Sequence, residues 1–420
     1  MMKRIHKIVA FLLAAVMMTA AVSCQKEVTA ENLMENIGQG NVSEVDLDDA
    51  FCKKYSSVAF NMLKNEYSPD GGNVVLSPLA AYYDLAMLAN GAEGTTRSEI
   101  ENTLTGFSNY ETINDCVHSF SGLMKNTESA KFYFENALWC NADKNVTPSN
   151  DFLSAAKTYF NADAFRESFG KPTVTNINNW SSNKTNMNAE YIIDEVSSDA
   201  PMYIINTTVL DADWEAPISP ENVSDGTFTT VDNQQESVQM MSSYEYVYFG
   251  NDEIHGFAKK YSGGNYAFLA FIPKNENWLS LSTLIDFLTS GTNYRKLIAD
   301  RKEYAVVDAG IPKFSCEYKG GMKNTLEALG CVRPFNTESA SFLNLGTADE
   351  KLYVEDINVY TRMSVTEKGT SKGTGASVSN SNSASSVVPV TLNRPFVFAV
   401  VDTKKYLPIV VGAVNHVKES

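Results

Sequence analysis

The 420-residue sequence predicts an α+β fold built as one large domain. Helical and strand-like patterns alternate along the chain, and no Pro-rich or Gly/Ser-rich linker interrupts residues 60–360. A chain of this length exceeds the usual size of one hydrophobic core, so two domains would be the default expectation. Because the sequence offers neither a linker nor a repeat with a period of about 20 to 50 residues, we prefer a single body at residues 46–420.

The N-terminus has the features of a bacterial secretory signal. Met1 to Lys7 is basic, and Ile8 to Val22 is an apolar run too short to span a bilayer as a stable helix, so residues 1–23 are predicted to be a signal peptide. Its end, Ala21-Val22-Ser23-Cys24, resembles a bacterial lipobox. This predicts that Cys24 is lipidated and that the protein sits on a bacterial cell envelope membrane, at the outer membrane or cell surface. The alternative is a secreted protein without an anchor.

The charge of the chain is strongly acidic. The net charge is −16, and loss of the signal peptide brings it to about −19. Nucleic acid phosphates need a basic surface, so nucleic acid is not expected as a partner. Residues 24–45 are polar with scattered acidic side chains, which predicts a lipidated cysteine followed by a flexible tether.

Helical periodicity accounts for eight segments. The clearest lies at residues 77–91, where Ser77 can cap the helix and Pro78 suits its first turn, while Gly91 ends it. Its apolar side chains recur on one face, so it should be buried beneath a sheet. The predicted helices cover residues 46–67, 77–91, 96–105, 110–126, 148–160, 174–187, 280–298 and 321–329.

Strand-like sequence fills much of the rest. The runs proposed for one large central sheet are 131–141, 202–213, 303–314 and 352–366. Near the C-terminus, Pro395 to Val414 predicts strands that are split by a turn at Asp402 to Lys405.

Between these strands, Glu367 to Val388 consists mostly of Gly, Ser, Thr and Asn. A compact domain rarely contains so long a loop without a functional reason. Exposed loops that connect core strands are common sites of binding and recognition. The segment is therefore the first candidate for a functional site.

The cysteines do not indicate a metal site or a disulfide framework. Apart from Cys24 there are five, without CxxC spacing, at positions 52, 116, 140, 316 and 331. Their surroundings are strand-like or helix-like, so they are predicted to be small buried hydrophobic residues.

Two short patterns match enzyme motifs, and both lack parts that the chemistry needs. Gly369 to Gly373 matches G-x-S-x-G, but a nucleophile elbow requires a helix directly after it. Ser181 to Lys184 matches S-x-x-K without a following K-T-G. His118, His255 and His416 show no metal-binding spacing. We therefore expect no enzyme activity, no cofactor and no metal site.

Several sequence motifs match one known family in order along the chain. VTEKGT at Val365 to Thr370 is similar to a hinge, and NRPFVF at Asn393 to Phe398 is similar to the strand that follows a reactive loop. Further matches begin at Asn73, Ile177 and Tyr203 and continue with IPKF at Ile311 and VVGAVNHV near the C-terminus. Together they resemble the serpin family over roughly residues 48–417. The resemblance implies a monomer with a large central β-sheet, smaller β-sheets, about eight to nine helices and a reactive loop at about 367–388.

The resemblance also implies a mechanism. A protease attacks the loop and forms an acyl-enzyme, and the cut loop inserts into the central sheet as a new strand. The hinge of this movement is assigned to Glu367, Gly369, Thr370, Lys372 and Thr374. The sheet-opening region is assigned to Ser77, Asn178, Asn206 and Trp214.

The matches in the sheet-opening region place Asn178 at the start of the helix that crosses the sheet, and Trp214 where the loop first enters. Ala80 and Val359 depart from the family pattern, because Ser and His are common there. Ordinary packing or capping remains the alternative role for each assigned residue.

The reactive bond is placed by two counts. The distance from Gly369 places it after Ser383, and the distance back from Asn393 places it after Ala384. Either choice presents a small side chain to the primary pocket of the protease. Elastase-like or subtilisin-like serine proteases are therefore the expected partners, papain-like cysteine proteases are an alternative, and trypsin-like enzymes are disfavoured.

One loop residue opposes inhibition. Alternate residues of an inserted strand point inward, and by resemblance the inward set is Thr370, Lys372, Thr374, Ala376 and Val378. Burying the Lys372 ammonium without a partner is costly. A non-inhibitory envelope lipoprotein of the same fold, cleaved as a substrate or binding a ligand or partner, therefore stays open as the alternative.

Overall fold

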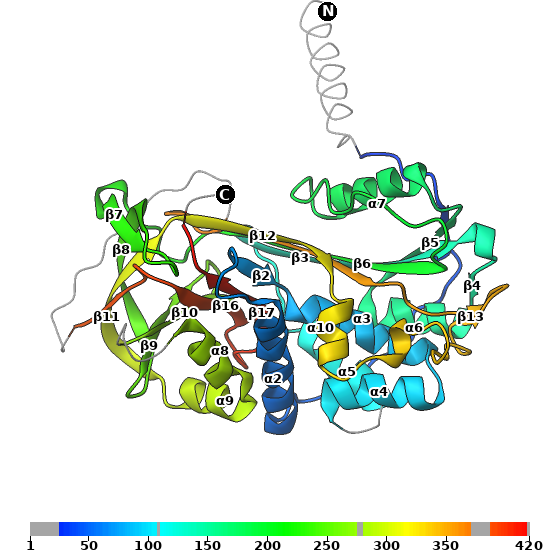
Figure 1. Cartoon of the computed structure of the whole chain (residues 1–420), viewed down its shortest axis with the longest axis horizontal. Coiled ribbons are helices and arrows are strands. Elements are labelled where there is room, and N and C mark those ends of the chain that lie inside the picture. The colour runs from blue at the N-terminus through cyan, green and yellow to red at the C-terminus, as the bar shows by residue number, and fades with distance from the viewer. Residues whose placement is uncertain (1–24, 107–109, 275–279, 371–386, 418–420) are drawn as a thin grey trace, which may run out of the picture.

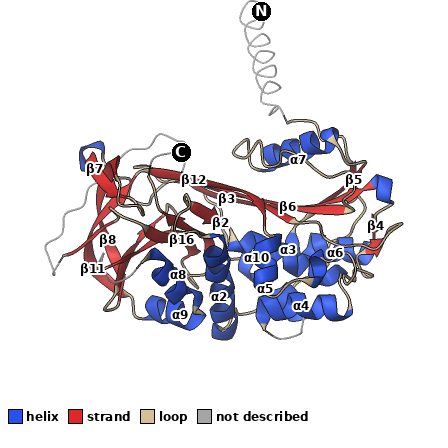
Figure 2. Ribbon diagram, in the orientation of Figure 1, coloured by secondary structure: helices blue, strands red, loops and turns tan. Residues whose placement is uncertain are grey.

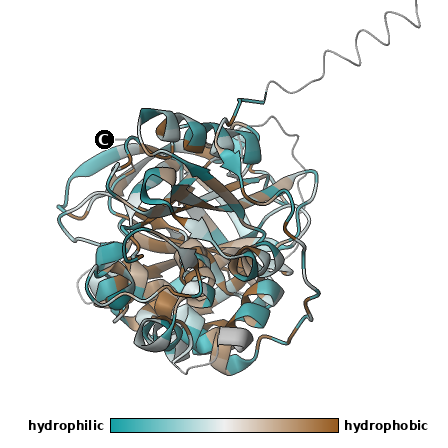
Figure 3. Cartoon of the chain, turned by 90° about the vertical axis from the view of Figure 1, so that its right-hand side faces the viewer, coloured by the Kyte–Doolittle hydropathy of each residue, from teal (hydrophilic) through white to brown (hydrophobic). Residues whose placement is uncertain are grey.

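The structure is a computed structural model that describes residues 25–106, 110–274, 280–370 and 387–417. Its described part forms one α+β body with two large β-sheets and nine α-helices, as predicted (Figures 1 and 2). Helices α2 to α6 and α10 lie on one face of the upper sheet in Figure 1, and α7 lies on its opposite face. The hydrophobic parts of the ribbon gather between the sheets and the helices (Figure 3).

Most helices lie where the periodicity predicts them. The helices are α2 (Asp49–Glu66), α3 (Pro78–Gly91), α4 (Gly94–Thr105), α5 (Tyr110–Ser121), α6 (Asn150–Phe160), α7 (Lys171–Lys184), α8 (Leu281–Thr289), α9 (Gly291–Ala299) and α10 (Lys323–Ala328). In α3 the Ser77 side chain caps the helix by accepting from the Ala80 amide, and Pro78 occupies the first turn.

The single helix predicted at 280–298 is wrong, because two helices occupy that stretch. The Ser290 side chain accepts from the Asn293 amide and thereby starts α9 directly after α8. A side chain at Gly291 would place its Cβ 1.9 Å from the Lys53 carbonyl oxygen of α2. The break therefore depends on a tertiary contact that local periodicity cannot reveal.

The upper sheet has six strands in the order β1-β5-β3-β6-β14-β12. Their bounds are β1 (Glu31–Asn32), β5 (Asp163–Glu167), β3 (Ala130–Asn141), β6 (Met202–Ala212), β14 (Ile357–Val365) and β12 (Phe314–Gly321). The neighbours β6 and β14 are parallel, whereas β3 with β6 and β12 with β14 are antiparallel. Polar residues of this sheet are deeply buried, among them Asn136, Asn206 and Thr361.

The second sheet has nine strands in the order β15-β11-β8-β9-β10-β16-β17-β2, with β7 paired to β8. Their bounds are β15 (Val388–Thr391), β11 (Lys302–Pro312), β8 (Gln235–Gly250), β9 (Ile254–Lys260), β10 (Tyr266–Pro273), β16 (Phe396–Asp402), β17 (Pro408–Val414), β2 (Val74–Leu76) and β7 (Val223–Thr229). Every residue of β10, β16 and β17 is buried. A small sheet pairs β13 (Gly346–Thr347) with β4 (Thr147–Pro148).

The assignment of residues 303–314 to the central sheet is wrong. Most of that run forms β11, which pairs with β8 and β15 in the nine-stranded sheet. The chain changes sheets at Lys313, which separates β11 from β12. Alternation of apolar side chains predicts a strand but not its neighbours. The other three runs, 131–141, 202–213 and 352–366, supply β3, β6 and β14 of the six-stranded sheet.

The segment that precedes α2 also differs from its prediction. Residues 25–45 do not form a loose tether in the structure, because they lie along the domain. The Gly40 amide donates to Thr158 Oγ1 over 2.8 Å, and the Val45 amide donates to Ser119 Oγ over 2.8 Å. Met34 is only 7% exposed. Polar composition suggested disorder, but partners far along the chain satisfy this backbone.

Two further findings concern cysteines and membranes. Cys52, Cys116, Cys140, Cys316 and Cys331 are buried, in agreement with the sequence prediction, and all five are free cysteines. Within the described residues, no helix has the length and apolar character that crossing a bilayer requires.

Candidate functional site

The candidate site is the end of the six-stranded sheet where β6 and β14 separate. These strands are paired in parallel from Ile357 opposite Ile204 to Arg362 opposite Val209. Beyond that point residues 210–212 and 363–365 have no pairing with each other in the structure as described. The outer ladders continue, since β3 pairs with β6 as far as Ala212 and β12 pairs with β14 as far as Val365. The sheet therefore has an opening between the ends of β6 and β14, although each strand stays paired with its outer neighbour there. We call it the β6–β14 opening.

The first residues after β14 occupy the entrance of this opening. The chain turns at Thr366, whose amide donates to the Gly369 carbonyl over 2.9 Å. Gly369 then forms an antiparallel bridge with Asp213, and the Thr370 amide donates to the Ala212 carbonyl over 2.8 Å. The Thr370 side chain is buried, with 8% exposure of the residue. The predicted hinge thus begins to pair with β6 in the direction opposite to that strand.

Gly369 is required by the geometry of this turn. Its φ is +146°, and a Cβ atom would lie 2.1 Å from the Ala212 carbonyl oxygen. Only glycine avoids both the backbone strain and the overlap. The residue predicted from the hinge motif is therefore explained by the close approach of the hinge to β6.

Trp214 donates two hydrogen bonds to the turn that follows β14. The indole Nε1 donates to the Thr366 carbonyl over 2.8 Å, and the Trp214 amide donates to the Lys368 carbonyl over 2.7 Å. The ring is 1% exposed and stacks on Tyr261 with centroids 4.4 Å apart. These contacts place Trp214 beside the turn that follows β14, and its role where the loop first enters the sheet stays a prediction.

A buried ion pair lies next to this tryptophan. Lys259 Nζ is 2.7 Å from Glu245 Oε1, and the same ammonium lies 5.4 Å from the centre of the Trp214 ring. Lys259 also donates to the Ala216 carbonyl over 3.1 Å. These contacts hold the indole in one orientation. This cluster could not be predicted from the sequence, because single charged residues in strands follow no recognisable pattern.

Glu367 makes a more exposed contact. Its carboxylate is 2.8 Å from Lys313 Nζ, and each side chain is about one third exposed. The hydrogen bond from Lys313 is the main reason why the pKa of Glu367 is lowered. The Glu367 carbonyl also accepts from the Ile218 amide over 2.8 Å. The hinge is therefore tied to the segment after β11 as well as to β6.

Ser77 and Asn206 make hydrogen bonds with different strands beside the paired part of β6 and β14. The Ser77 amide donates to Thr361 Oγ1 of β14 over 3.1 Å, and its hydroxyl donates to the Ile409 carbonyl of β17 over 2.9 Å. Asn206 of β6 donates instead to Asn136 Oδ1 of β3 over 2.5 Å. These side-chain hydrogen bonds therefore join β14 to the start of α3 and β6 to β3. Neither bond crosses the ladder between β6 and β14.

The partners of this pair were missed by sequence reasoning. Thr361 and Asn136 fall in strand runs where polar side chains have no special pattern. Thr208 was also missed, and its hydroxyl donates to Asn206 Oδ1 over 2.8 Å. Opposite Asn206 stands Val359, a departure from the family pattern, which offers no hydrogen bond across the ladder.

Asn178 was expected at the start of the helix that crosses the sheet, and this placement is wrong. It lies in the middle of α7, which begins at Lys171. Its Oδ1 accepts from the amides of Ile192 and Ile193 over 2.8 and 3.1 Å, and its Nδ2 donates to the Ile193 carbonyl over 2.9 Å. Asn178 therefore joins α7 to the chain that returns beneath it.

Several predicted site residues lie outside the described residues. These are Lys372 and Thr374 of the hinge, Ser383 and Ala384 of the reactive bond, and Cys24 of the anchor. Among the residues that the structure does describe, no three His, Cys, Asp or Glu side chains are grouped so that they could hold a metal ion.

The fold and the site define a class of protein: a single α+β domain in which the segment following β14 begins to pair with β6 at an opening of the six-stranded sheet. The chain belongs to the serpin family, since the family model described as Serpin (serine protease inhibitor) matches residues 53–417. Members of this family are in general protease inhibitors rather than catalysts, and some are non-inhibitory binders.

Relatives and solved structures agree with this membership. An uncharacterized serpin-like protein of Methanosarcina acetivorans is 25% identical over 365 residues, which cover 85% of this chain and 83% of the relative. The plasma serine protease inhibitor of Mus musculus is 26% identical over 349 residues, with coverage of 80% and 84%.

Among solved structures, the thermophilic serpin tengpin in its native state has a TM-score of 0.87 and 34% identity, covering 93% of this chain and all of that chain. The latent state of tengpin has a TM-score of 0.78 at 32% identity, with coverage of 90% and 100%. Thyroxine-binding globulin in complex with thyroxine has a TM-score of 0.75 at 21% identity, with coverage of 88% and 99%, which supports the fold alone.

Proposed function

We propose that this chain inhibits proteases by acting as a suicide substrate. The protease cuts the loop near Ser383 and Ala384, and the cut loop enters the six-stranded sheet between β6 and β14 while the acyl-enzyme is still intact. The single observation that supports this most is the antiparallel start of the hinge, with Gly369 opposite Asp213 at the β6–β14 opening.

The register of the inserted strand follows from that start. Residues directly opposite each other in an antiparallel pair share one face of the sheet. Continuing from Gly369 opposite Asp213 brings Thr370 opposite Ala212 and Lys372 opposite Leu210. Both Ala212 and Leu210 face the main hydrophobic core. The inward set expected from the family pattern is therefore the set that this register turns toward the core.

Insertion replaces the ladder between β6 and β14 by two ladders, one on each side of the new strand. The parallel pairing of β6 with β14 is lost, and the new strand pairs in antiparallel fashion with both, a slightly more stable arrangement per residue. Ordering the loop costs about 1–2 kcal/mol per residue, and each new hydrogen bond contributes about 0.5–1.5 kcal/mol. Because these terms nearly cancel, burial of the inward side chains decides the outcome.

The small side chains around Ser383 and Ala384 favour elastase-like or subtilisin-like serine proteases, and papain-like cysteine proteases are the next class to test. The experiment incubates the mature protein with one enzyme of each class. An inhibitor gives a complex that survives SDS, whereas a substrate gives only the cut chain. Cut chain without complex for every enzyme would contradict inhibition.

The second candidate function is cleavage without inhibition, and Lys372 is the reason to keep it. In the register above, its ammonium would enter next to Leu210, where burial of a charge is costly unless the long side chain reaches solvent. A slow insertion would let the acyl-enzyme hydrolyse first. The protein would then be a non-inhibitory envelope lipoprotein of the serpin fold that is cleaved as a substrate or binds a ligand or partner.

We also propose that the protein is an envelope lipoprotein anchored through Cys24, with an unanchored secreted form as the alternative. The lipobox-like end of the signal peptide supports this. Cys24→Ala should move the protein from the membrane fraction to the soluble fraction. A variant that stays with the membrane as completely as the wild type would contradict the anchor.

A further inference from the structure

The residues that follow Cys24 are held on α7 by a row of asparagines. Asn183 exchanges two hydrogen bonds with the Lys26 backbone, accepting from its amide over 2.8 Å and donating to its carbonyl over 2.7 Å. Asn179 donates to the Glu27 carbonyl over 2.8 Å, and Asn176 accepts from the Thr29 amide over 3.0 Å. Because these asparagines recur at helical spacing, they form one stripe along α7.

This stripe fixes the exit point of the N-terminus. An extended chain spans at most about 3.3–3.6 Å per residue, so two residues bring Cys24 within roughly 7 Å of Lys26. In Figure 1 the described chain begins next to α7. A lipid on Cys24 would therefore bring the bilayer to this part of the surface and not to a point at the end of a long tether.

Two large apolar side chains are exposed close to that exit. Tyr191 is 75% exposed and Met187 is 54% exposed, and both belong to the segment that follows α7. Lys26 Nζ lies 6.0 Å from the centre of the Tyr191 ring. Met187 also adopts a φ of +62°, in the left-handed region that a long apolar residue seldom occupies. Burial accounts for neither residue, and backbone preference does not favour methionine at position 187.

We propose that Lys26, Met187 and Tyr191 form a membrane-contact patch that rests at the headgroup level of the bilayer beside the Cys24 anchor. The inference rests on the proposed lipidation of Cys24. Tyrosine is favoured at this depth because its ring is apolar and its hydroxyl is polar. A lysine with a long aliphatic stem suits the same region.

The charge of the patch indicates the kind of lipid. Lys26 is paired with Glu190 over 2.5 Å, so the two charges cancel. Asp194 is paired with Lys319 over 2.6 Å, whereas Glu195 is exposed a few residues further on, and the chain as a whole is acidic. An anionic surface would repel these groups. The patch therefore fits a zwitterionic bilayer, bound through the anchor and shallow apolar contact.

With α7 toward the membrane, the end of the molecule that contains β8 and β11 faces away from it. β8 and β11 lie at the end of the molecule away from α7 (Figure 1), and β15, which follows the loop, pairs with β11. This end therefore remains accessible to a protease in solution.

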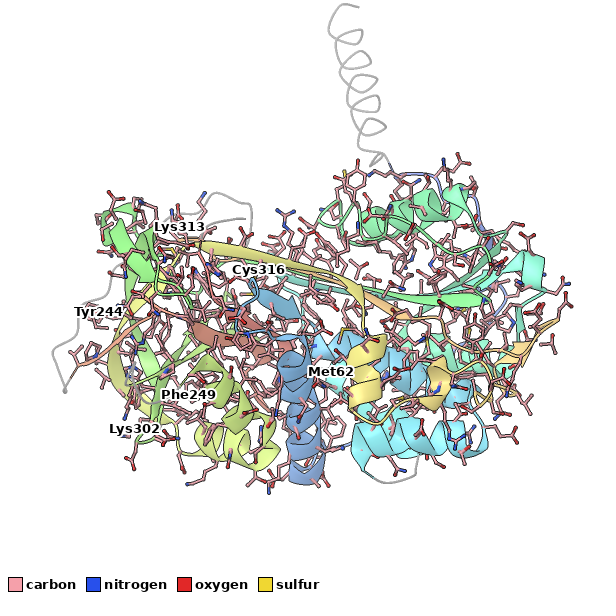
Figure 4. All side chains as sticks on the ribbon, in the orientation of Figure 1. Met62, Tyr244, Phe249, Lys302, Lys313 and Cys316 are labelled. Carbon is pink, nitrogen blue, oxygen red and sulfur yellow. The ribbon has the colours of Figure 1, made fainter. Side chains whose placement is uncertain are left out.

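The test uses the full lipidated protein, reconstituted into vesicles of zwitterionic phosphatidylcholine. Tyr191→Cys is labelled with a polarity-sensitive fluorophore, and some of the lipids carry a quencher in the upper acyl chain. Labelling is selective because the five described cysteines are buried. Tyr244→Cys is the matched control, since Tyr244 is also an exposed tyrosine, 61% exposed, and lies at the opposite end of the molecule (Figure 4).

The label at position 191 should shift to the blue and lose most of its emission to the quencher, and the label at 244 should do neither. A label at Met187→Cys should behave like that at 191. Protein that floats with the vesicles but shows equal, weak quenching at all three positions overturns the patch and leaves the anchor intact. Protein that does not float with the vesicles overturns the lipidation on which the patch depends.

Discussion

The two large sheets of this protein differ in how completely their neighbouring strands pair and pack. In the nine-stranded sheet, β10, β16 and β17 are buried throughout, and Phe398 of β16 packs against Phe268 of β10 with ring centroids 5.8 Å apart. In the six-stranded sheet, the ladder between β6 and β14 stops before the strands do, and its interior contains Asn206 and Thr361. Apolar packing fixes the first sheet, whereas the second keeps an opening.

The difference indicates where the molecule can change. Separating apolar strands exposes their whole interior to water. Separating β6 from β14 breaks one parallel ladder, while the side-chain contacts of Asn206 with Asn136 and of Ser77 with Thr361 stay on either side of it. The fold thus combines a half that apolar packing fixes with a half in which we propose that another strand inserts.

The largest expected effect is on the half that apolar packing fixes. Phe398→Ala leaves a cavity in the core and should lower the free energy of unfolding by about 3–5 kcal/mol. Urea unfolding of the intact and the loop-cleaved protein measures it, and the loss should be similar in both. Val387→Ala, at a residue that is 44% exposed, is the control and should change stability by less than about 0.5 kcal/mol. A similar loss for both variants would contradict the comparison.

The next effect is at the entrance of the opening. Gly369→Ala forces a Cβ against the Ala212 carbonyl and into a disfavoured φ, which together should cost at least about 1–3 kcal/mol. The hinge should leave its place, so the Thr370 amide should lose hydrogen-exchange protection. Gly264→Ala is the control, because Gly264 also has a positive φ but no atom within 4 Å of its Cβ position. Retained protection of Thr370 in Gly369→Ala would show that its bond to Ala212 does not depend on glycine.

The third effect concerns the race between insertion and hydrolysis. Removing the ammonium with Lys372→Ala should speed insertion, and a barrier lowered by about 1.4 kcal/mol changes the rate tenfold. The ratio of SDS-stable complex to cut chain at fixed protease should therefore rise. Lys368→Ala is the matched control, because Lys368 precedes the inserted residues. An unchanged ratio in Lys372→Ala would mean that the register of the inserted strand is shifted by one residue.

The smallest effect is electrostatic. The lowered pKa of Glu367 means that its pair with Lys313 contributes stability above the unfolded pKa and loses it as the pH falls through the lower, folded pKa. For a partly exposed pair the contribution is about 0.2–1 kcal/mol. Glu367→Gln should lower the melting temperature slightly at pH 7 and not below the folded pKa. A difference that persists in acid would assign the effect to packing.

Local features of this fold could be predicted from sequence. The helix cap at Ser77 follows from a residue type whose backbone preference is specific, and it lies where expected. The strand runs that became β3, β6 and β14 were also placed correctly. Each of these depends on neighbours in sequence.

Features set by distant contacts could not be predicted. The composition of residues 25–45 predicts a tether. In the structure, Asn176, Asn179 and Asn183 of α7 bind the backbone at the start of this segment. Thr158 and Ser119 bind the backbone near its end. Likewise the partner sheet of β11 depends on pairing with β8, which lies far away in sequence.

The central claim is that the cut loop adds a strand between β6 and β14. A disulfide across this ladder tests it most directly. Thr208 and Thr361 stand opposite each other in the parallel register, and a strand spacing of about 4.8 Å lies within the range of Cα separations that disulfides bridge.

The measurement is the melting temperature before and after loop cleavage, for the wild type and for the Thr208→Cys, Thr361→Cys double variant. Cleavage should raise the melting temperature of the wild type markedly. It should not raise that of the oxidised double variant, and reduction of the new disulfide should restore the rise. A wild-type melting temperature that cleavage leaves unchanged or lowers, or an oxidised variant that responds like the wild type, would contradict insertion between these two strands.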